Sequence, residues 1–209
     1  MVTLAIRTVY WDIGGVLLRN GFGRRQRAGF YEVLALKKAD RAAFEARRED
    51  ANWFWERGLI DDAEFFQRTL FWKERSFSLS DVQQALYAQQ EIAHTGSFEI
   101  LHALHAKKQV RQATLNNESR ELNGFRLNRF SLRPYFEFCI CSAYVGEMKP
   151  AAGIYRAALA IGGDGPGEAC FIDDKEENVA AAVAAGFIGL HFTTPESLRT
   201  QLGSIGVAV

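Results

Sequence analysis

The sequence predicts an α/β fold with a parallel β-sheet covered by helices on both faces, and three observations support this prediction. An apolar stretch over residues 4–12 ends in Asp12 and two glycines, as a buried strand does where it leaves a sheet. From residue 97 onward, strand and helix patterns alternate. With 209 residues, of which 48% are hydrophobic, the chain suits one core domain with an insertion.

The region after the first strand is expected to be helical. We expect a loop over residues 16–29, where three glycines flank a basic run at 24–27. That run is interpreted as a solvated face or, alternatively, as a gate for a substrate phosphate. Helix formers fill 39–48, Asp61 fits a helix N-cap, and Ser80 starts a further helix. Because no strand pattern interrupts residues 30–95, the sequence predicts a helical insertion whose aromatic side chains pack mainly on one another.

The remaining elements alternate in order. Strands are expected at 110–115, 135–142, 169–172 and 188–192, and helices at 97–106, 119–130, 154–161, 178–185 and 195–202. The glycine-rich stretch 162–167 follows a helix and precedes a strand. A phosphate-binding loop requires the reverse order, so we interpret this stretch as a connecting turn.

Charge and composition narrow the possible partners and location. Lys and Arg number 25, as do Asp and Glu, so nothing in the net charge favours nucleic acid or an anionic membrane as a partner. The N-terminus does not resemble a signal peptide, and no apolar run is long enough for a spanning helix. The three cysteines are expected to be free thiols in a reducing cytoplasm. The oligomeric state is left open between monomer and homodimer.

Polar residues follow four predicted strands. They are Asp12, Asn116 with Asn117, the loop that contains Lys149, and Asp173 with Asp174. Parallel strands bring their C-terminal ends to one edge of the sheet, where ligands bind. Three carboxylates at one edge repel one another and require a cation, and carboxylate oxygens suit Mg²⁺, which also binds substrate phosphate.

These groups together predict phosphoryl chemistry. Lys149 supplies a compact charge for phosphate or for a developing negative charge. The side chains of Asn116 and Asn117 can hold further phosphate oxygens. Asp12, held in its ionised form, can then attack phosphorus and form an aspartyl-phosphate. Each residue alone has an ordinary structural interpretation as a cap, a turn or a surface residue, and the prediction rests on their combination.

The same residues resemble the haloacid dehalogenase superfamily, in its phosphatase-rich branch. The four matching segments are 12–17, 115–118, Lys149-Pro150 and 171–186. The resemblance implies a three-layer, Rossmann-like core formed by residues 1–18 and 96–209, with residues 19–95 as a helical cap that covers the active site. It also implies Mg²⁺ bound by Asp12, by the backbone carbonyl of Gly14 and by Asp174, while Asp173 supports Lys149 or a metal-bound water.

Two positions depart from the pattern of the superfamily. Gly14 stands where phosphatases carry a second Asp as general acid/base, and such help is worth roughly 10²–10⁴-fold in rate. A group from the cap, or Glu118, is a candidate replacement. Asn116 stands where Ser or Thr is usual; it can donate through its amide, and Thr114 on the same face is an alternative.

The sequence therefore leaves three functions open. The leading prediction is a Mg²⁺-dependent phosphomonoester hydrolase that acts on a small phosphorylated metabolite. A phosphate-binding or regulatory protein with little turnover is favoured by Gly14 and Asn116, although such a binder has no need of Asp12 as a nucleophile. A 2-haloacid dehalogenase is disfavoured because that enzyme needs no metal and does not carry the Asp173-Asp174 pair.

Overall fold

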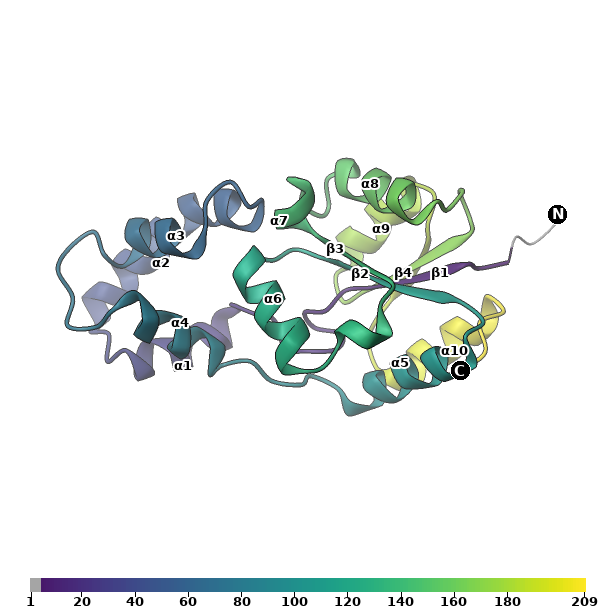
Figure 1. The fold of residues 1–209 in the computed structure, drawn as a ribbon, viewed down its shortest axis with the longest axis horizontal. Coiled ribbons are helices and arrows are strands. Elements are labelled where there is room, and N and C mark those ends of the chain that lie inside the picture. The colour runs from purple at the N-terminus through teal and green to yellow at the C-terminus, as the bar shows by residue number, and fades with distance from the viewer. Residues whose placement is uncertain (1–4) are drawn as a thin grey trace.

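The computed structural model describes residues 5–209, in which five parallel strands form one sheet of order β3-β2-β1-β4-β5 (Figure 1). The strands are β1 (Thr8–Trp11), β2 (Arg111–Asn116), β3 (Phe138–Cys141), β4 (Ala169–Asp173) and β5 (Ile188–His191). The predicted α/β class is confirmed. β1 is shorter than the predicted 4–12 because β2 and β4 begin opposite Thr8. Residue 4, like the rest of 1–4, lies outside the described residues.

Helices cover both faces of this sheet, which gives the three layers expected. One face carries α5 (Thr95–Lys107), α6 (Arg120–Arg129) and α10 (Pro195–Ser204), and the other carries α8 (Ala152–Gly162) and α9 (Glu176–Ala184). In the central strand, Val9 and Trp11 point to the first face and Tyr10 to the second, and all three are fully buried. Burial of each such side chain is worth about 1.5–3 kcal/mol, so β1 is anchored firmly.

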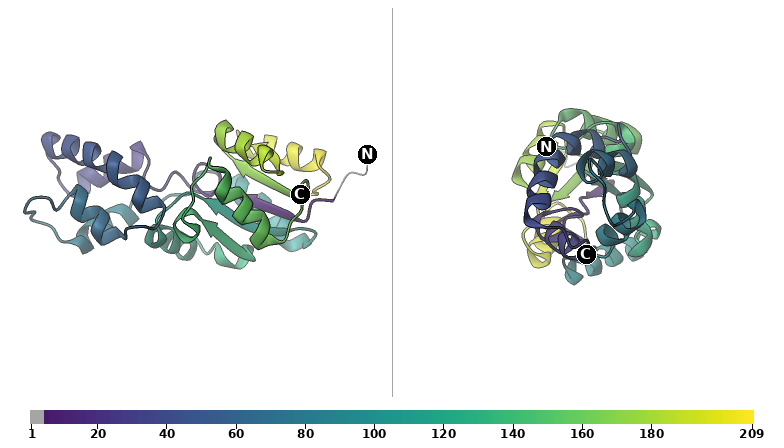
Figure 2. Two further views of the ribbon diagram at one scale, coloured as in Figure 1. Left: turned by 90° about the horizontal axis from the view of Figure 1, so that it is seen from above. Right: turned by 90° about the vertical axis from the view of Figure 1, so that its left-hand side faces the viewer.

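The inserted residues form a helical unit at one end of the elongated molecule (Figures 1 and 2). It consists of α1 (Arg24–Val33), α2 (Lys38–Glu56), α3 (Asp62–Thr69) and α4 (Leu79–Tyr87). Its hydrophobic core is rich in aromatic side chains, with Trp55 and Phe65 stacked at 4.1 Å between ring centroids. The two segments that connect this unit to the sheet domain are joined by backbone hydrogen bonds: Arg19 N donates to Glu91 O (2.9 Å) and Ala93 N donates to Leu17 O (2.9 Å).

Two predicted boundaries within the helical unit were wrong. The loop expected over 16–29 ends early, because α1 begins at Arg24. Arg27, within the basic run, donates from Nε to Glu45 Oε1 at 2.7 Å, and Phe30 packs in the aromatic core. The last of the helices begins after Ser78 rather than at Ser80, because Ser78 and Asp81 form a reciprocal capping box. The predicted cap at Asp61 is confirmed, since its side chain accepts from Glu64 N.

The strand expected over 135–142 is split into three elements. A 3-10 helix, η1 (Arg133–Tyr135), precedes β3, and a short helix, α7 (Ser142–Val145), follows it. Ser142 Oγ accepts a hydrogen bond from Glu118 N (2.9 Å) and donates one to Glu56 O (2.5 Å), so the chain turns here to connect the core to the helical unit.

Two smaller predictions are also tested by the structure. The stretch 162–167 is a connecting turn, with Gly163 in the left-handed conformation at the end of α8. Cys139, Cys141 and Cys170 are free thiols, as expected. Across residues 5–209, no helix has both the length and the apolar character needed to cross a membrane.

Candidate active site

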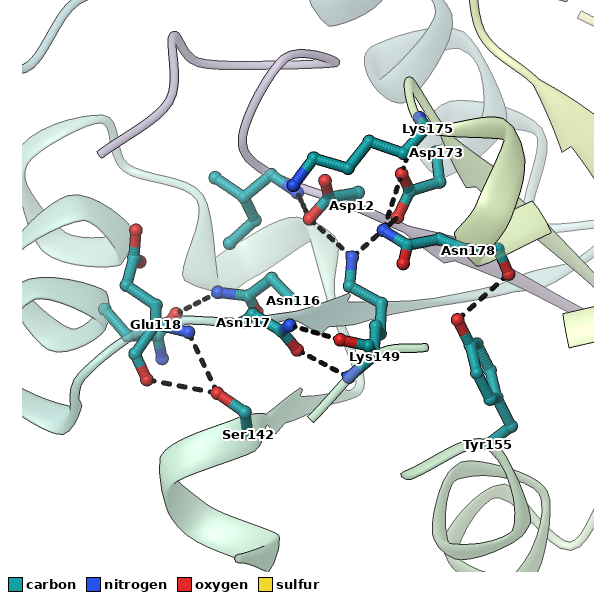
Figure 3. Close-up of polar contacts among 12 residues, drawn as sticks. Asp12, Asn116, Asn117, Glu118, Ser142, Lys149, Tyr155, Asp173, Lys175 and Asn178 are labelled. Atoms are coloured by element: carbon teal, nitrogen blue, oxygen red, sulfur yellow. Dashed lines mark hydrogen bonds and ion pairs between the residues drawn. The ribbon is translucent and has the colours of Figure 1, made fainter. Parts of the chain in front are cut away.

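The C-terminal edge of the sheet brings Asp12, Lys149 and Asp173 into direct contact (Figure 3). Asp12 follows β1 and Asp173 ends the neighbouring β4, while Lys149 comes from the loop between α7 and α8. Lys149 Nζ lies 3.0 Å from Asp12 Oδ1 and 2.7 Å from Asp173 Oδ2. All three side chains are buried, so this charge arrangement is shielded from solvent.

The three groups depend on one another electrostatically. Burial opposes the charge of Lys149, but Asp12 and Asp173 outweigh that effect and raise the pKa of the ammonium group. Burial raises the pKa of Asp12; the charge of Lys149 opposes the shift, and the charges of Asp173 and Asp174 add to it. Lys149 thus neutralises only part of the charge of the neighbouring carboxylates, and a second cation would reduce the remaining repulsion between them.

The acidic residues fit a divalent metal ion. Ligand atoms of Asp12, Asp173 and Asp174 all lie within 4.8 Å of one another. Both oxygens of Asp173 already accept hydrogen bonds: Oδ1 from Lys175 N (2.8 Å) and Oδ2 from Lys149 Nζ (2.7 Å). In contrast, Asp174 Oδ1 is buried and accepts no hydrogen bond from the described residues. Asp12 and Asp174 are therefore the carboxylates best placed to bind a hard cation. Gly14 and Asp12 line the same small cavity.

The side chains of Asn116, the last residue of β2, and of Asn117, the residue after it, make different contacts. Asn117 Nδ2 donates to Lys149 O and its Oδ1 accepts from Lys149 N, both at 2.9 Å, so this side chain positions the lysine loop. Asn116 donates to Asn123 Oδ1 (3.1 Å), yet it also lines the cavity beside Asp12 and Lys149. The position of Asn116 suits phosphate contact through its second amide hydrogen, whereas the side chain of Asn117 is already engaged.

Glu118 lies deeper than its place in the sequence indicated. Its carboxylate pairs with Arg126, which is also buried, and Arg126 Nη2 donates to Arg19 O at 2.6 Å. Burial raises the pKa of Glu118, and Arg126 opposes that shift. The pair therefore connects α6 to the segment that leads into the helical unit.

A cleft leads from the acidic centre to the helical unit. A small cavity lined by Asp12 and Lys149 adjoins a larger one of about 320 Å³, and the two share part of their lining: Asn20, Gly21, Asn117, Glu118 and Lys175. The larger cavity is also lined from α2 by Arg48, Asn52, Trp55 and Glu56. Trp55 is one of the cap aromatic residues that could face a pocket. No motif in the sequence marks Arg48, Asn52, Glu56 or Asn20, because only the docking of the helical unit brings them to the site.

A parallel sheet that presents a lysine between two buried aspartates, beside a third with an unused oxygen, defines an α/β enzyme of the hydrolase type. The chain belongs to the haloacid dehalogenase-like hydrolase family, whose model matches residues 6–186. The resemblance drawn from the sequence motifs is thereby confirmed.

Two characterised relatives share part of the sequence. Flavin mononucleotide hydrolase 1 of Arabidopsis thaliana is 28% identical over 155 residues, which are 74% of this chain and 62% of the relative. The sesquiterpene phosphatase of Aspergillus oryzae is 42% identical over 65 residues, 31% of this chain and 32% of the relative. The match thus spans less than two thirds of the length of either relative.

Solved structures share the fold over nearly the whole chain. A haloacid dehalogenase family enzyme from Bacteroides thetaiotaomicron superposes with a TM-score of 0.76 at 20% identity, covering 95% of this chain and 98% of that one. Another structure of that enzyme, with a TM-score of 0.70 at 21% identity, covers 91% of this chain and 96% of that one and contains magnesium and inorganic phosphate. At these identities the likeness concerns the fold.

Proposed function

We propose that this protein is a Mg²⁺-dependent phosphomonoester hydrolase that forms an aspartyl-phosphate on Asp12. The observation that carries the proposal is the contact of Lys149 with Asp12 (3.0 Å) and Asp173 (2.7 Å), beside the unused oxygen of Asp174. One relative named as a flavin mononucleotide hydrolase, another named as a sesquiterpene phosphatase, and the magnesium and phosphate in a structure of similar fold support the same class of reaction.

The residues of the site divide the work as follows. Asp12 attacks phosphorus through one carboxylate oxygen, and the ester oxygen leaves. Lys149 holds Asp12 in its ionised form and offers positive charge to the phosphoryl oxygens, while Asn117 fixes the backbone of the lysine loop. Asp173 holds Lys149 in place. We assign Asp12, the carbonyl of Gly14 and Asp174 to Mg²⁺, which when bound supplies charge neutralisation.

We further propose that residues 19–95 act as a substrate-selecting cap on a core formed by 1–18 and 96–209. The cap contributes Arg48, Asn52 and Glu56 to a cavity of about 320 Å³, near the lower limit for ligand sites. Such a small and polar cavity favours a compact, hydroxylated metabolite over a flavin ring or a sesquiterpene chain. The free thiols support an intracellular, reducing location, and we propose the cytoplasm.

One assay tests the proposed function. Purified protein is incubated with p-nitrophenyl phosphate, with and without Mg²⁺, and 2-chloropropionate is offered in parallel. We expect phosphate release that requires Mg²⁺ and no release of halide. Halide release without metal would identify a dehalogenase instead. Tight binding of a phosphate analogue such as vanadate without any turnover would favour the regulatory alternative that Gly14 raises.

The metal assignment predicts an effect at Gly15. This residue has φ of +85°, and a Cβ atom there would lie 2.2 Å from Asp174 Oδ2. Gly15→Ala should therefore displace Asp174 and weaken Mg²⁺ binding at least about tenfold, measured by titration calorimetry. Gly206→Ala is the matched control, because Gly206 has φ of +81° and open space around it. Equal Mg²⁺ affinity in both variants would remove Asp174 from the metal site.

A further inference from the structure

Because Gly14 has no side chain, the position that would carry the general acid/base has no group to transfer protons in the proposed reaction. When the bond between phosphorus and the ester oxygen breaks, the departing alkoxide needs a proton, and the water that later attacks phosphorus must lose one. General acid–base help of this kind is worth roughly 10²–10⁴-fold. A replacement must lie in the cleft that the leaving group occupies, on the side away from Asp12.

Glu56 is the last residue of α2, and the core holds it at that position. Ser142 Oγ donates to Glu56 O at 2.5 Å, and Arg57 Nε donates to Gly146 O at 2.6 Å. Gly58 then passes so close to α7 that a Cβ atom there would lie 2.2 Å from Ala143 O. The end of α2 is thus docked on the core.

Glu56 lines the larger cavity, which adjoins the one lined by Asp12. The lysine shared by the two linings, Lys175, extends over the site in Figure 3. A phosphomonoester with its phosphate in the small cavity beside Asp12 and Lys149 would therefore direct its leaving group into the cavity that Glu56 lines. Glu56 thus belongs to the lining of the cavity that would receive the leaving group.

The surroundings of Glu56 suit a group that both gives and takes a proton. Burial raises the pKa of its carboxyl to about 7, the hydrogen bond from Asn52 opposes the shift, and the nearby Glu118 adds to it. The charges of Lys175 and Arg48 also lower it. A pKa close to the working pH is the most effective value for general acid–base catalysis.

Glu118 is the rival carboxylate in this cleft, but its position serves another purpose. One of its oxygens pairs with the buried Arg126, which in turn holds the backbone at Arg19. Protonation of Glu118 would leave the guanidinium group buried without its counter-charge, at a cost of several kcal/mol. Glu56 accepts a hydrogen bond from the neutral Asn52, and Lys175 and Arg48 act on it only as nearby charges, so its protonation breaks no ion pair of this kind.

We propose that Glu56 is the general acid and base of the hydrolysis, an inference that rests on the phosphatase function proposed above. As Asp12 bonds to phosphorus and the ester bond breaks, the Glu56 carboxyl gives its proton to the ester oxygen and the alcohol leaves. The Glu56 carboxylate then takes a proton from water as the water oxygen bonds to phosphorus. The bond between phosphorus and Asp12 breaks, which returns Asp12 as a carboxylate and releases phosphate.

The test compares two aryl phosphates that differ by one nitro group and therefore in the basicity of the leaving group. Phenyl phosphate releases a basic phenolate that needs a proton, whereas p-nitrophenyl phosphate releases a weakly basic one. In Glu56→Gln, we expect kcat/KM to fall about 10²–10³-fold for phenyl phosphate and less than about tenfold for p-nitrophenyl phosphate. Glu49→Gln, an exposed position on the same helix, is the control and should change neither value.

The wild-type pH profile supplies a second measurement that needs no variant. Because the acid must be protonated, kcat/KM for phenyl phosphate should decline as the pH rises above about 7, and the decline should be much weaker for p-nitrophenyl phosphate. Equal losses on both substrates in Glu56→Gln, or a loss selective for phenyl phosphate in Glu118→Gln instead, would overturn the assignment. Wild-type protein that hydrolyses neither ester with Mg²⁺ would refute the proposed function itself.

Discussion

Asp12→Asn should abolish phosphomonoester hydrolysis, with a loss of at least about 10⁴-fold in kcat. The amide is nearly the same size as the carboxyl group but has no anionic oxygen to attack phosphorus, so no aspartyl-phosphate can form. The measurement is steady-state release of p-nitrophenol with Mg²⁺ present. Acid quenching after brief exposure to radiolabelled substrate should trap labelled protein only in the wild type.

The same variant separates catalysis from binding. Asp12 forms an ion pair with Lys149, and a neutral amide at position 12 weakens that contact. Lys149 keeps its second partner, Asp173, at 2.7 Å. We therefore expect the variant to stay folded and to bind phosphate measurably. If Asp12→Asn retained substantial Mg²⁺-dependent turnover, Asp12 would not be the nucleophile and another group would have to attack phosphorus.

The meeting of the acidic residues was predictable from the sequence because it follows from topology. A parallel sheet fixes the strand ends at one edge, and β1 and β4 are neighbours, so Asp12 and Asp173 had to lie close together. The individual contacts were not predictable. That both oxygens of Asp173 are in use while Asp174 keeps one unused depends on the path of α9, which brings Asn178 Nδ2 to 3.0 Å from Asp173.

The helical unit illustrates where sequence patterns fail. Glycines and a basic run made residues 24–29 resemble a loop. In the structure, Arg27 instead donates a hydrogen bond to Glu45 on α2, and this tertiary contact stabilises α1. Glu56 has no local signal at all, because its role depends on where the end of α2 meets Ser142. Asn117 was assigned to phosphate from its position after a strand, but its side chain faces the backbone of Lys149.

Lys149→Met should reduce both activity and stability. The substitution keeps much of the side-chain volume but leaves the buried carboxylates of Asp12 and Asp173 without their shared cation. Removal of one partner from a buried ion pair costs about 3–5 kcal/mol, which urea unfolding in EDTA should reveal. Turnover should fall at least about 10³-fold, since the phosphoryl charge loses its nearest cation. Lys107→Met, at an exposed position on α5, is the control for the loss of one positive charge.

Addition of Mg²⁺ then shows whether the loss of stability in Lys149→Met is electrostatic. Lys149 Nζ also lies 5.1 Å from the ring centroid of Phe171, so part of the contribution of Lys149 is packing of its side chain beside this ring, which methionine can largely reproduce. If Lys149 stabilises the protein mainly through its charge, the site of the variant is more negative than that of the wild type and binds Mg²⁺ more tightly. The variant then gains more stability from the bound cation, because a ligand stabilises the state that binds it. Mg²⁺ should therefore restore a larger part of the unfolding free energy to Lys149→Met than it adds to the wild type. An equal gain in both proteins would show that Lys149 acts mainly through packing, and the electrostatic role assigned to it beside Asp12 would be wrong.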